Sequence, residues 1–337
     1  MDVQLAEKQV ETWAKASARS LGFKGAKIEA KYIWNPGGFV NQSYRLSDGE
    51  TVRHLKLAQE YRAPLLQQWA RLSGYLTSHY HAPRLFEEVT QEIIPGYSYG
   101  LVFDYIQGTP LSSCSDPTAV VENVLKALNR LHADQEFKKG VEAHTRSYSE
   151  AFAEEYIVRF EEDLETIRSE RHLLDFVSDD ALDWFDSEVR TLKRLVYQLP
   201  SFQMKARDTV HNDLNWHNVL VEGDGSYWII DWDDLTVNGD AAMDYSVFLW
   251  PLHRSKDWPF WEKRLRDLEG GEPFERMEVY FRAKLLDDVI DVLADYIEAE
   301  KLPEVKERTQ QEAKETHLRA YPEYLGRYAK VPGKLQG

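Results

Sequence analysis

The spacing of apolar residues changes from a helical to a strand period within the first sixty residues. Residues 3–20 carry apolar side chains at helical intervals, namely Val3, Ala6, Val10, Trp13 and Ala14. This spacing predicts an amphipathic helix. From residue 27 to 58 the chain alternates apolar and polar side chains, interrupted by "NPGG" and by the turn "SDGE". Alternation between turn residues is typical of hairpins, so we predict a three-stranded antiparallel meander with a glycine-containing loop at its first corner.

The following segment predicts one helix and one further strand pair. Residues 64–80, "PLLQQWARLSGYLTSHY", have a helical period, with Pro64 in the first turn. "RLFEEVTQEII" and "YSYGLVFDYI" alternate as strands on either side of Pro95-Gly96. The break Gln107–Pro110 comes next and is where a lobe boundary fits best. We therefore predict an N-terminal lobe over residues 1–106 and a C-terminal lobe over residues 107–337.

Beyond this break the pattern is mostly helical. Asp116 is a suitable N-cap for a helix with Pro117 at its first position. Residues 146–198 and the chain after residue 240 also have a helical period, and a short hairpin within residues 207–232 interrupts them. The predicted fold class is α+β, with a small antiparallel β N-lobe and a mostly helical C-lobe.

Composition and charge narrow the classes of partner. The chain of 337 residues has a formal charge of −16, which disfavours nucleic acid and anionic membranes as partners. The same charge is compatible with a cationic substrate, or with solubility alone. The single cysteine, Cys114, permits no intrachain disulfide. No run reaches the roughly 20 apolar residues that span a bilayer, and the N-terminus lacks an apolar signal segment, so we expect a cytoplasmic protein.

One polar motif carries the chemistry. "HNDLNWHN", residues 211–218, has the spacing H-x-D-x-x-x-x-N, and "IIDWDD" follows at the end of a predicted strand. Phosphoryl transfer to a hydroxyl needs a carboxylate that orients the hydroxyl, and Asp213 fits this role. It also needs oxygen ligands for Mg²⁺, which Asn218 and Asp231 can supply. Asp233 is either a second metal ligand or an exposed acid of the loop.

Two other interpretations of these residues fit the sequence less well. Asp213 and Asn218 favour turns as residue types, but their position just before the strand that ends in Ile-Asp-Trp-Asp favours a reaction centre. His211 and His217 could suggest zinc, but no cysteine pair stands nearby. We expect His211 to be a buried brace for its loop.

His211–Asn218 followed by Ile230-Asp231-Trp232-Asp233 resembles the catalytic and metal loops of the aminoglycoside phosphotransferase and choline kinase family. These are small-molecule kinases with a protein-kinase-like two-lobe fold. "GDAAMDYSVFLW" follows, and Asp244 stands where the family's second aspartate braces the catalytic loop. The resemblance covers roughly residues 27–300.

The resemblance implies an ATP site in the first lobe. It places Lys56, on the third strand, against the α- and β-phosphates. The loop "NPGGFVNQSY" would cover the phosphates, with Gly37, Gly38, Asn41 and Ser43 as its contacts. The C=O of Asp104 and the N–H of Ile106 would bind the adenine edge through the backbone.

The helix after the third strand departs from the family pattern. The family carries a glutamate there that pairs with the lysine, whereas this helix offers Gln67 and Gln68, and Glu60 follows Lys56 too closely. Either Lys56 is held in another way or the affinity for ATP is lower.

These observations lead to one functional hypothesis with several acceptors. We expect an ATP- and Mg²⁺-dependent kinase that phosphorylates a hydroxyl of a small molecule, first of all an aminoglycoside-like or other amine-bearing one. Choline, ethanolamine, thiamine, homoserine and methylthioribose-like acceptors stay open, as does a catalytically silent binding protein. A protein kinase is disfavoured because the second loop lacks Asp-Phe-Gly. The acidic edge of the helix within residues 283–300 is either a solvated face or part of an amine-binding pocket. The oligomeric state stays open.

Overall fold

The computed structural model describes residues 3–25, 27–33, 41–139, 145–301, 303 and 305–328. The chain divides into two compact units, which are described separately. The first comprises Met1–Leu131, Gln135–Val141 and His211–Leu235. The second comprises His132–Asp134, Glu142–Val210 and Thr236–Gly337. The loops that carry Asp213 and Asp231 follow residue 106 in the sequence but belong to the first unit. The predicted lobe boundary at residue 106 stays a prediction. Within the described ranges, every helix is too short or too polar to cross a bilayer.

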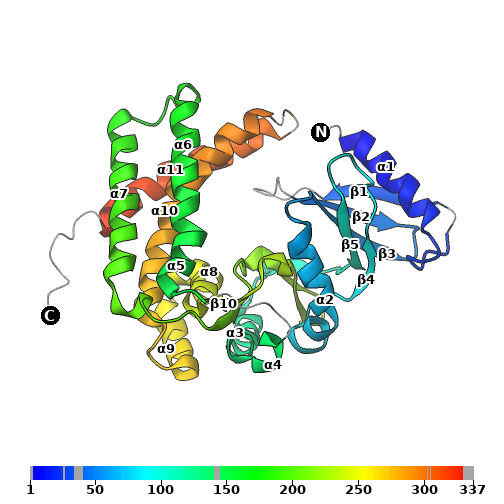
Figure 1. The fold of residues 1–337 in the computed structure, drawn as a ribbon, viewed down its shortest axis with the longest axis horizontal. Coiled ribbons are helices and arrows are strands. Elements are labelled where there is room, and N and C mark those ends of the chain that lie inside the picture. The colour runs from blue at the N-terminus through cyan, green and yellow to red at the C-terminus, as the bar shows by residue number, and fades with distance from the viewer. Residues whose placement is uncertain are drawn as a thin grey trace. The chain divides into compact units, whose positions relative to one another are not determined.

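A five-stranded antiparallel sheet forms most of the first unit's N-terminal part (Figure 1). Its strands are β1 (Glu29–Ile33), β2 (Asn41–Ser47), β3 (Val52–Ala58), β4 (Leu85–Val89) and β5 (Tyr99–Asp104), in the order β1-β2-β3-β5-β4. The predicted meander is confirmed. Its second turn has Gly49 at a φ of 95°, and the turn before β5 has Gly96 at 86°, a conformation that glycine adopts without a steric penalty.

Two helices pack on this sheet. Side chains alternate between the two faces along β3, so the two helices contact different residues of this strand. Helix α1 (Val3–Ala16) joins one core cluster with Leu55 and Leu57. Lys56, between them, points to the other face, where Trp69 of α2 (Ala63–Tyr80) stacks on Phe103 with ring centroids 4.4 Å apart. The site-bearing face of the sheet is thus the α2 face.

Helix α1 also covers the free edge of the sheet. Strand β1 pairs only with β2 among the described strands. Its outward backbone N–H groups donate to carboxylates of α1 instead: Tyr32 to Glu7 Oε1 at 3.0 Å, and Ala30 to Glu11 Oε1 at 3.4 Å. The edge donors of β1 are therefore satisfied within the chain.

The rest of the first unit is a small β-sheet with short helices. The helices are α3 (Thr118–Ala133), which ends in the second unit, and α4 (Gln135–Lys138). The sheet comprises β6 (Thr109–Pro110), β8 (Val219–Val221) and β9 (Tyr227–Ile229), in the order β6-β8-β9. The predicted hairpin within residues 207–232 is confirmed as β8–β9. The predicted break at Gln107–Pro110 in part forms a strand, because Thr109 and Pro110 pair with Val221 and Leu220.

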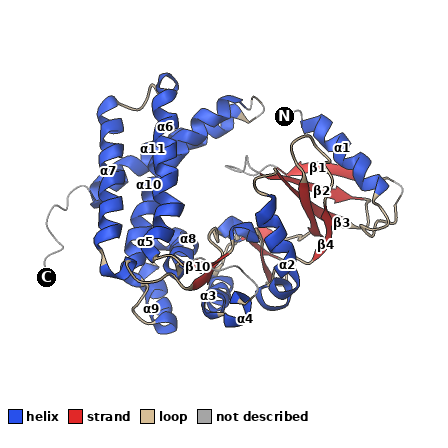
Figure 2. Cartoon of the chain, in the orientation of Figure 1, coloured by secondary structure: helices blue, strands red, loops and turns tan. Residues whose placement is uncertain are grey.

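The second unit is mostly helical, as the sequence predicts (Figure 2). Its elements are α5 (Tyr148–Phe152), the π-helical turn η2 (Ala153–Ile157), α6 (Val158–Ser169), α7 (Asp179–Gln198), β7 (Asp208–Val210), β10 (Thr236–Gly239), α8 (Ala241–His253), α9 (Trp258–Glu269), α10 (Phe274–Glu298) and α11 (Lys306–Tyr328). Strands β7 and β10 pair antiparallel. Gly239 is required there, because a Cβ atom would lie 2.0 Å from Val210 Cγ2.

A buried ion pair and a buried histidine–aspartate contact fix the start of α8. Asp240 caps the helix by accepting from the Ala242 N–H at 2.9 Å, and its other oxygen accepts from Arg276 Nε at 2.8 Å. One turn on, Asp244 lies 3.0 Å from His132 Nε2. Asp244 thus braces a histidine of the short segment His132–Asp134, and the catalytic-loop role that the resemblance implies for it stays a prediction.

Candidate active site

The loop after β7 holds Asp213 and Asn218 together. Asn218 is buried, and its Nδ2 donates to the Asp213 C=O at 2.7 Å and to Asp213 Oδ2 at 3.0 Å. Asn215 Nδ2 donates to Asp213 Oδ1, also at 3.0 Å. The carboxylate of Asp213 is exposed but has a fixed orientation. Since Asn218 donates through its nitrogen, its side-chain oxygen is the atom that could face a metal ion.

His211 is a buried brace for this loop, as expected. Its Nε2 lies 2.9 Å from the Ile230 C=O, and its ring packs on Trp232 with centroids 4.7 Å apart. Asn212, at a φ of 71°, donates from Nδ2 to the Asp234 C=O at 2.8 Å. These contacts tie the first loop to the second.

The second loop begins with a sharp change of backbone direction. The Ile230 N–H donates to the Asn218 C=O at 2.9 Å, which places Asn218 beside the end of β9. Asp231 comes next with a φ of 67°, in the left-handed region that non-glycine residues enter at a cost. The short helix η6 (Trp232–Asp234) then follows.

Lys56 lies between the first two carboxylates of this loop. Its buried ammonium group donates to Asp231 Oδ1 and, at 3.0 Å, to Asp233 Oδ1. It also lies 5.6 Å from the centre of the Trp69 ring. Burial alone would lower the pKa of Lys56, but the two carboxylates outweigh burial and raise it. Lys56 is therefore a fixed positive charge.

The two carboxylates differ in exposure and in pKa. The Asp233 side chain is 4% exposed, and that of Asp231 is 33% exposed. Burial raises the pKa of Asp231 to about 8, and the charge of Asp233 adds to this effect. Although burial opposes it, the charges of Lys56 and Arg62 hold the pKa of Asp233 below its usual range. Neighbouring cations thus favour the charged form of Asp233, and its interpretation as an exposed acid of the loop is wrong.

Two residues outside the motif complete the surroundings of Asp233. Its Oδ2 accepts from Asn41 Nδ2 at 2.9 Å and from Arg62 at 3.4 Å. Arg62 also binds Asp234 Oδ1 at 2.9 Å. Asn41 is among the residues predicted from the sequence, whereas Arg62 is not, since a single arginine before a helix belongs to no motif.

Helix α2 lacks the glutamate expected from the family pattern, and Lys56 is held by other acids instead. Gln68 Nε2 donates to the Leu235 C=O at 2.7 Å, while Gln67 and Glu60 are exposed. Within the described residues, the acids that pair with Lys56 are Asp231 and Asp233.

The structure describes three of the other predicted nucleotide contacts, Ser43, Asp104 and Ile106. Gly37 and Gly38 lie outside the described residues. Ser43 is buried in β2, directly opposite Lys56 in the register of β2 and β3. The carboxylate of Asp104 pairs with Arg53 at 3.1 Å and with Arg84 at 3.0 Å. The predicted adenine contact is the backbone C=O of Asp104, which these ion pairs do not involve. Among the described residues, the Ile106 N–H donates to no other group.

Asn218, Asp231 and Asp233 suit a hard cation by donor type, because Mg²⁺ prefers carboxylate and amide oxygens. Over the described part of the chain, no three or more His, Cys, Asp or Glu side chains are arranged to hold a metal ion. The predicted set is not of that kind, since one of its members is an amide. Its role as a metal site stays a prediction.

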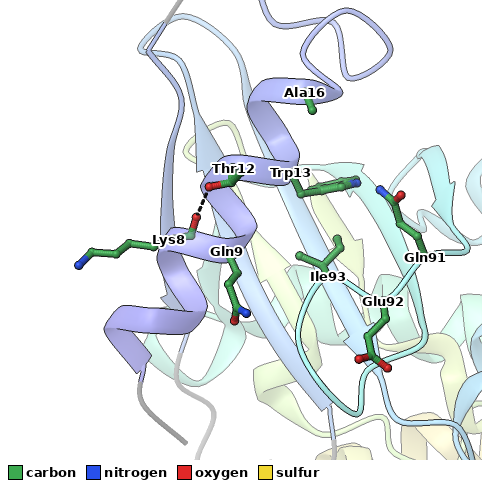
Figure 3. A pocket seen from close by; sticks show the side chains of 8 residues that line it. All are labelled: Lys8, Gln9, Thr12, Trp13, Ala16, Gln91, Glu92 and Ile93. Carbon is green, nitrogen blue, oxygen red and sulfur yellow. Dashed lines mark hydrogen bonds between the residues drawn. The ribbon is translucent and has the colours of Figure 1, made fainter.

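A cavity lies elsewhere in the first unit (Figure 3). It has a volume of about 520 Å³ and lies between α1 and the turn before β5. Trp13 and Ile93 provide its apolar wall, and its other lining side chains are mainly polar. None of the candidate site residues that the structure describes lines it.

Comparison with known proteins identifies the family. Residues 34–286, three quarters of the chain, match the profile of the phosphotransferase enzyme family. The chain belongs to this family. No curated protein gives a significant match to the phosphotransferase.

Solved structures similar to this phosphotransferase share its fold at low identity. The GDP and kanamycin complex of APH(2")-IIia has a TM-score of 0.63 and 12% identity, covering 93% of this chain and 99% of that one. Spectinomycin phosphotransferase with ADP and spectinomycin has a TM-score of 0.58 and 13% identity, covering 93% and 98%. The ethanolamine kinase of Plasmodium vivax has a TM-score of 0.51 and 13% identity, covering 87% and 82%. The predicted protein-kinase-like α+β fold is confirmed.

The second unit of the phosphotransferase contains the acidic helix edge noted in the sequence. The edge comprises Asp288, Asp291, Asp295 and Glu298, and Asp288 lies 3.9 Å from Arg254 Nη1. Asp291 lies 3.7 Å from Arg159 Nε. This edge is therefore not a simple solvated face, because part of it is compensated by internal cations.

Proposed function

We propose that this phosphotransferase moves the γ-phosphate of ATP to a hydroxyl of a small molecule. The proposal rests on one observation: a single compact unit holds both an exposed, fixed Asp213 and a buried lysine bound to two aspartates of the adjoining loop. A backbone hydrogen bond joins the two loops, since the Ile230 N–H donates to the Asn218 C=O and Ile230 immediately precedes Asp231.

Asp213 is the residue that orients the acceptor. Each of its carboxylate oxygens accepts one amide hydrogen, from Asn215 or Asn218. An ionised carboxylate has about four acceptor positions, so capacity is left for a hydroxyl. Because the side chain is exposed, an acceptor can reach it. Its role is to hold the hydroxyl in line and accept its proton.

Lys56 is the residue that contacts the phosphates, and Asn218 and Asp231 are the ligands of Mg²⁺. Bound Mg²⁺ offsets charge on the transferring phosphoryl group. The chain's own contribution is to fix the amide oxygen of Asn218, through the two hydrogen bonds that its nitrogen donates to Asp213. The adenine edge would bind at the Asp104 C=O and the Ile106 N–H, and Asn41 and Ser43 would contact the phosphates from the covering loop.

The acceptor that we favour is an aminoglycoside-like or other amine-bearing alcohol. The structures similar in fold include proteins described with kanamycin, spectinomycin and ethanolamine as ligand or substrate. All three are amines, and the formal charge of −16 favours the approach of cations. Choline, thiamine, homoserine and methylthioribose-like compounds are the alternative acceptors.

An ATP-consumption assay across these acceptors tests the proposal. We expect ADP release above the basal rate with at least one amine-bearing alcohol and Mg²⁺. Asp213→Ala should lower turnover about 10²–10⁴-fold with ATP binding retained, because Asp213 acts on the acceptor. Asp224→Ala, in the exposed β8–β9 turn, is the matched control and should match wild type. Unchanged turnover in Asp213→Ala would remove the assignment.

A further inference from the structure

Lys56 needs an anionic partner that remains when Asp231 is used elsewhere. In the proposed function, Asp231 serves as a ligand of Mg²⁺. Helix α2 supplies no replacement, because Gln68 is neutral and is bound to the Leu235 C=O. A buried ammonium group without an acid partner is costly. Asp233 is the other acid on Lys56 among the described residues.

The contacts of Asp233 differ from those expected of a metal ligand. Its Oδ1 accepts from Lys56 at 3.0 Å, and its Oδ2 accepts from Asn41 at 2.9 Å and Arg62 at 3.4 Å. Three nitrogen donors, two of them cationic, thus surround a carboxylate that is almost inaccessible to solvent. Cationic neighbours on both oxygens oppose a divalent cation at the same carboxylate.

Asp231 has the opposite properties. Its side chain is one third exposed, and Lys56 is its only ion-pair partner within the described chain. It stands at the end of β9 directly after the residue that pairs with Asn218. The surroundings of Asp231 and Asp233 therefore favour different roles for the two acids.

We propose that Asp233 is the permanent anionic partner of Lys56, in place of a helix acid and not as a metal ligand, and that Arg62 is the positioning residue that fixes Asp233. The inference rests on the proposed function, in which Lys56 contacts the nucleotide phosphates. Arg62 acts through Asp233, since its contacts are to Asp233 and Asp234 and not to Lys56.

ATP binding to the full chain, measured by calorimetry with EDTA and again over a Mg²⁺ titration, tests this assignment. Asp233→Asn should weaken metal-free ATP binding about tenfold, the loss of one charge-assisted hydrogen bond, and leave the Mg²⁺ concentration for half-maximal activity unchanged. Asp231→Asn should do the reverse. Arg62→Gln should follow Asp233→Asn more weakly, and Arg62→Lys should restore part of the binding.

Asp234→Asn is the matched control. It removes the other carboxylate that Arg62 binds, and the Asp234 side chain is 42% exposed with no contact to Lys56. We expect metal-free binding within about twofold of wild type. If Asp233→Asn does not fold, Arg62→Gln carries the test.

Three results would overturn the inference. The first is a raised Mg²⁺ requirement in Asp233→Asn with normal metal-free binding, which would make Asp233 a metal ligand. The second is equal loss in Asp234→Asn and Arg62→Gln, which would mean that Arg62 acts through Asp234. The third is wild-type protein that binds no ATP under either condition, which alone would also remove the proposed function.

Discussion

Asp163 of α6 is a carboxyl group placed among other charges of the second unit. Burial raises its pKa to about 7 against the opposing charge of Arg159, and Asp287 and Asp295 raise it further. The folded state therefore holds this proton more tightly than the unfolded chain does. Since the unfolded chain releases the proton first, stability should fall as the pH rises from about 4 to about 7 and then level off.

Asp163→Asn removes this titration. We expect the variant to melt a few degrees above wild type at pH 8, because no charge is then buried, with the difference shrinking towards pH 4. Thermal unfolding between pH 4 and 8 measures it. Asp183→Asn, an exposed position on α7, is the control. A melting difference that is the same at every pH would contradict the prediction.

Site residues could be predicted where they lie close together in the sequence. Asp213, Asn218, Asp231 and Asp233 lie within one short stretch, so their spacing indicated their chemistry. Arg62 could not be found this way, because its contacts to Asp233 and Asp234 span 171 and 172 residues. The partner of Lys56 was recognised only as missing from α2, since the sequence does not reveal which distant acid replaces it.

The start of α8 depends on a buried ion pair. Arg276 and Asp240 have fully buried side chains, and the Arg276 guanidinium also lies 3.9 Å from the centre of the Tyr148 ring. Arg276→Ala would remove the cationic partner of the buried Asp240 carboxyl group. We expect the free energy of unfolding to fall by about 3–5 kcal/mol, measured by urea denaturation.

A double variant and a control separate charge from packing. Arg276→Met with Asp240→Asn should recover part of the loss, because no unpaired charge remains and the asparagine can still cap α8. Glu272→Ala removes the half-exposed partner of Arg276 and should cost at most about 1 kcal/mol. A loss in Arg276→Ala no greater than in Glu272→Ala would show that the pair contributes little.

Whole elements were predicted well where their period is long enough to detect. The helices at residues 3–16 and 63–80 and the three-stranded meander match the expected spans closely. Strands β6, β7 and β10 were missed, since each is two to four residues long and pairs with a strand that does not adjoin it in the sequence. Their pairing depends on residues far along the chain, such as Gly239 against Val210.

At the scale of the whole molecule, α1 has a task beyond its apolar packing. Replacing both Glu7 and Glu11 by alanine removes the acceptors of the Tyr32 and Ala30 N–H groups. We expect faster aggregation on mild heating, followed by light scattering, with enzyme activity retained before heating. Gln4→Ala with Lys8→Ala, on the exposed side of the same helix, should aggregate as wild type does. Equal rates in both double variants would contradict this role.

The two glutamates of α1 have a consequence for encounters between copies of the protein. A strand with free outward donors is a template on which a neighbouring polypeptide can lay down another strand. Here the outward donors of β1 are already bound by Glu7 and Glu11 of α1. Growth of the sheet from β1 into a fibre would first require α1 to leave the folded strand, so the intact fold resists such growth.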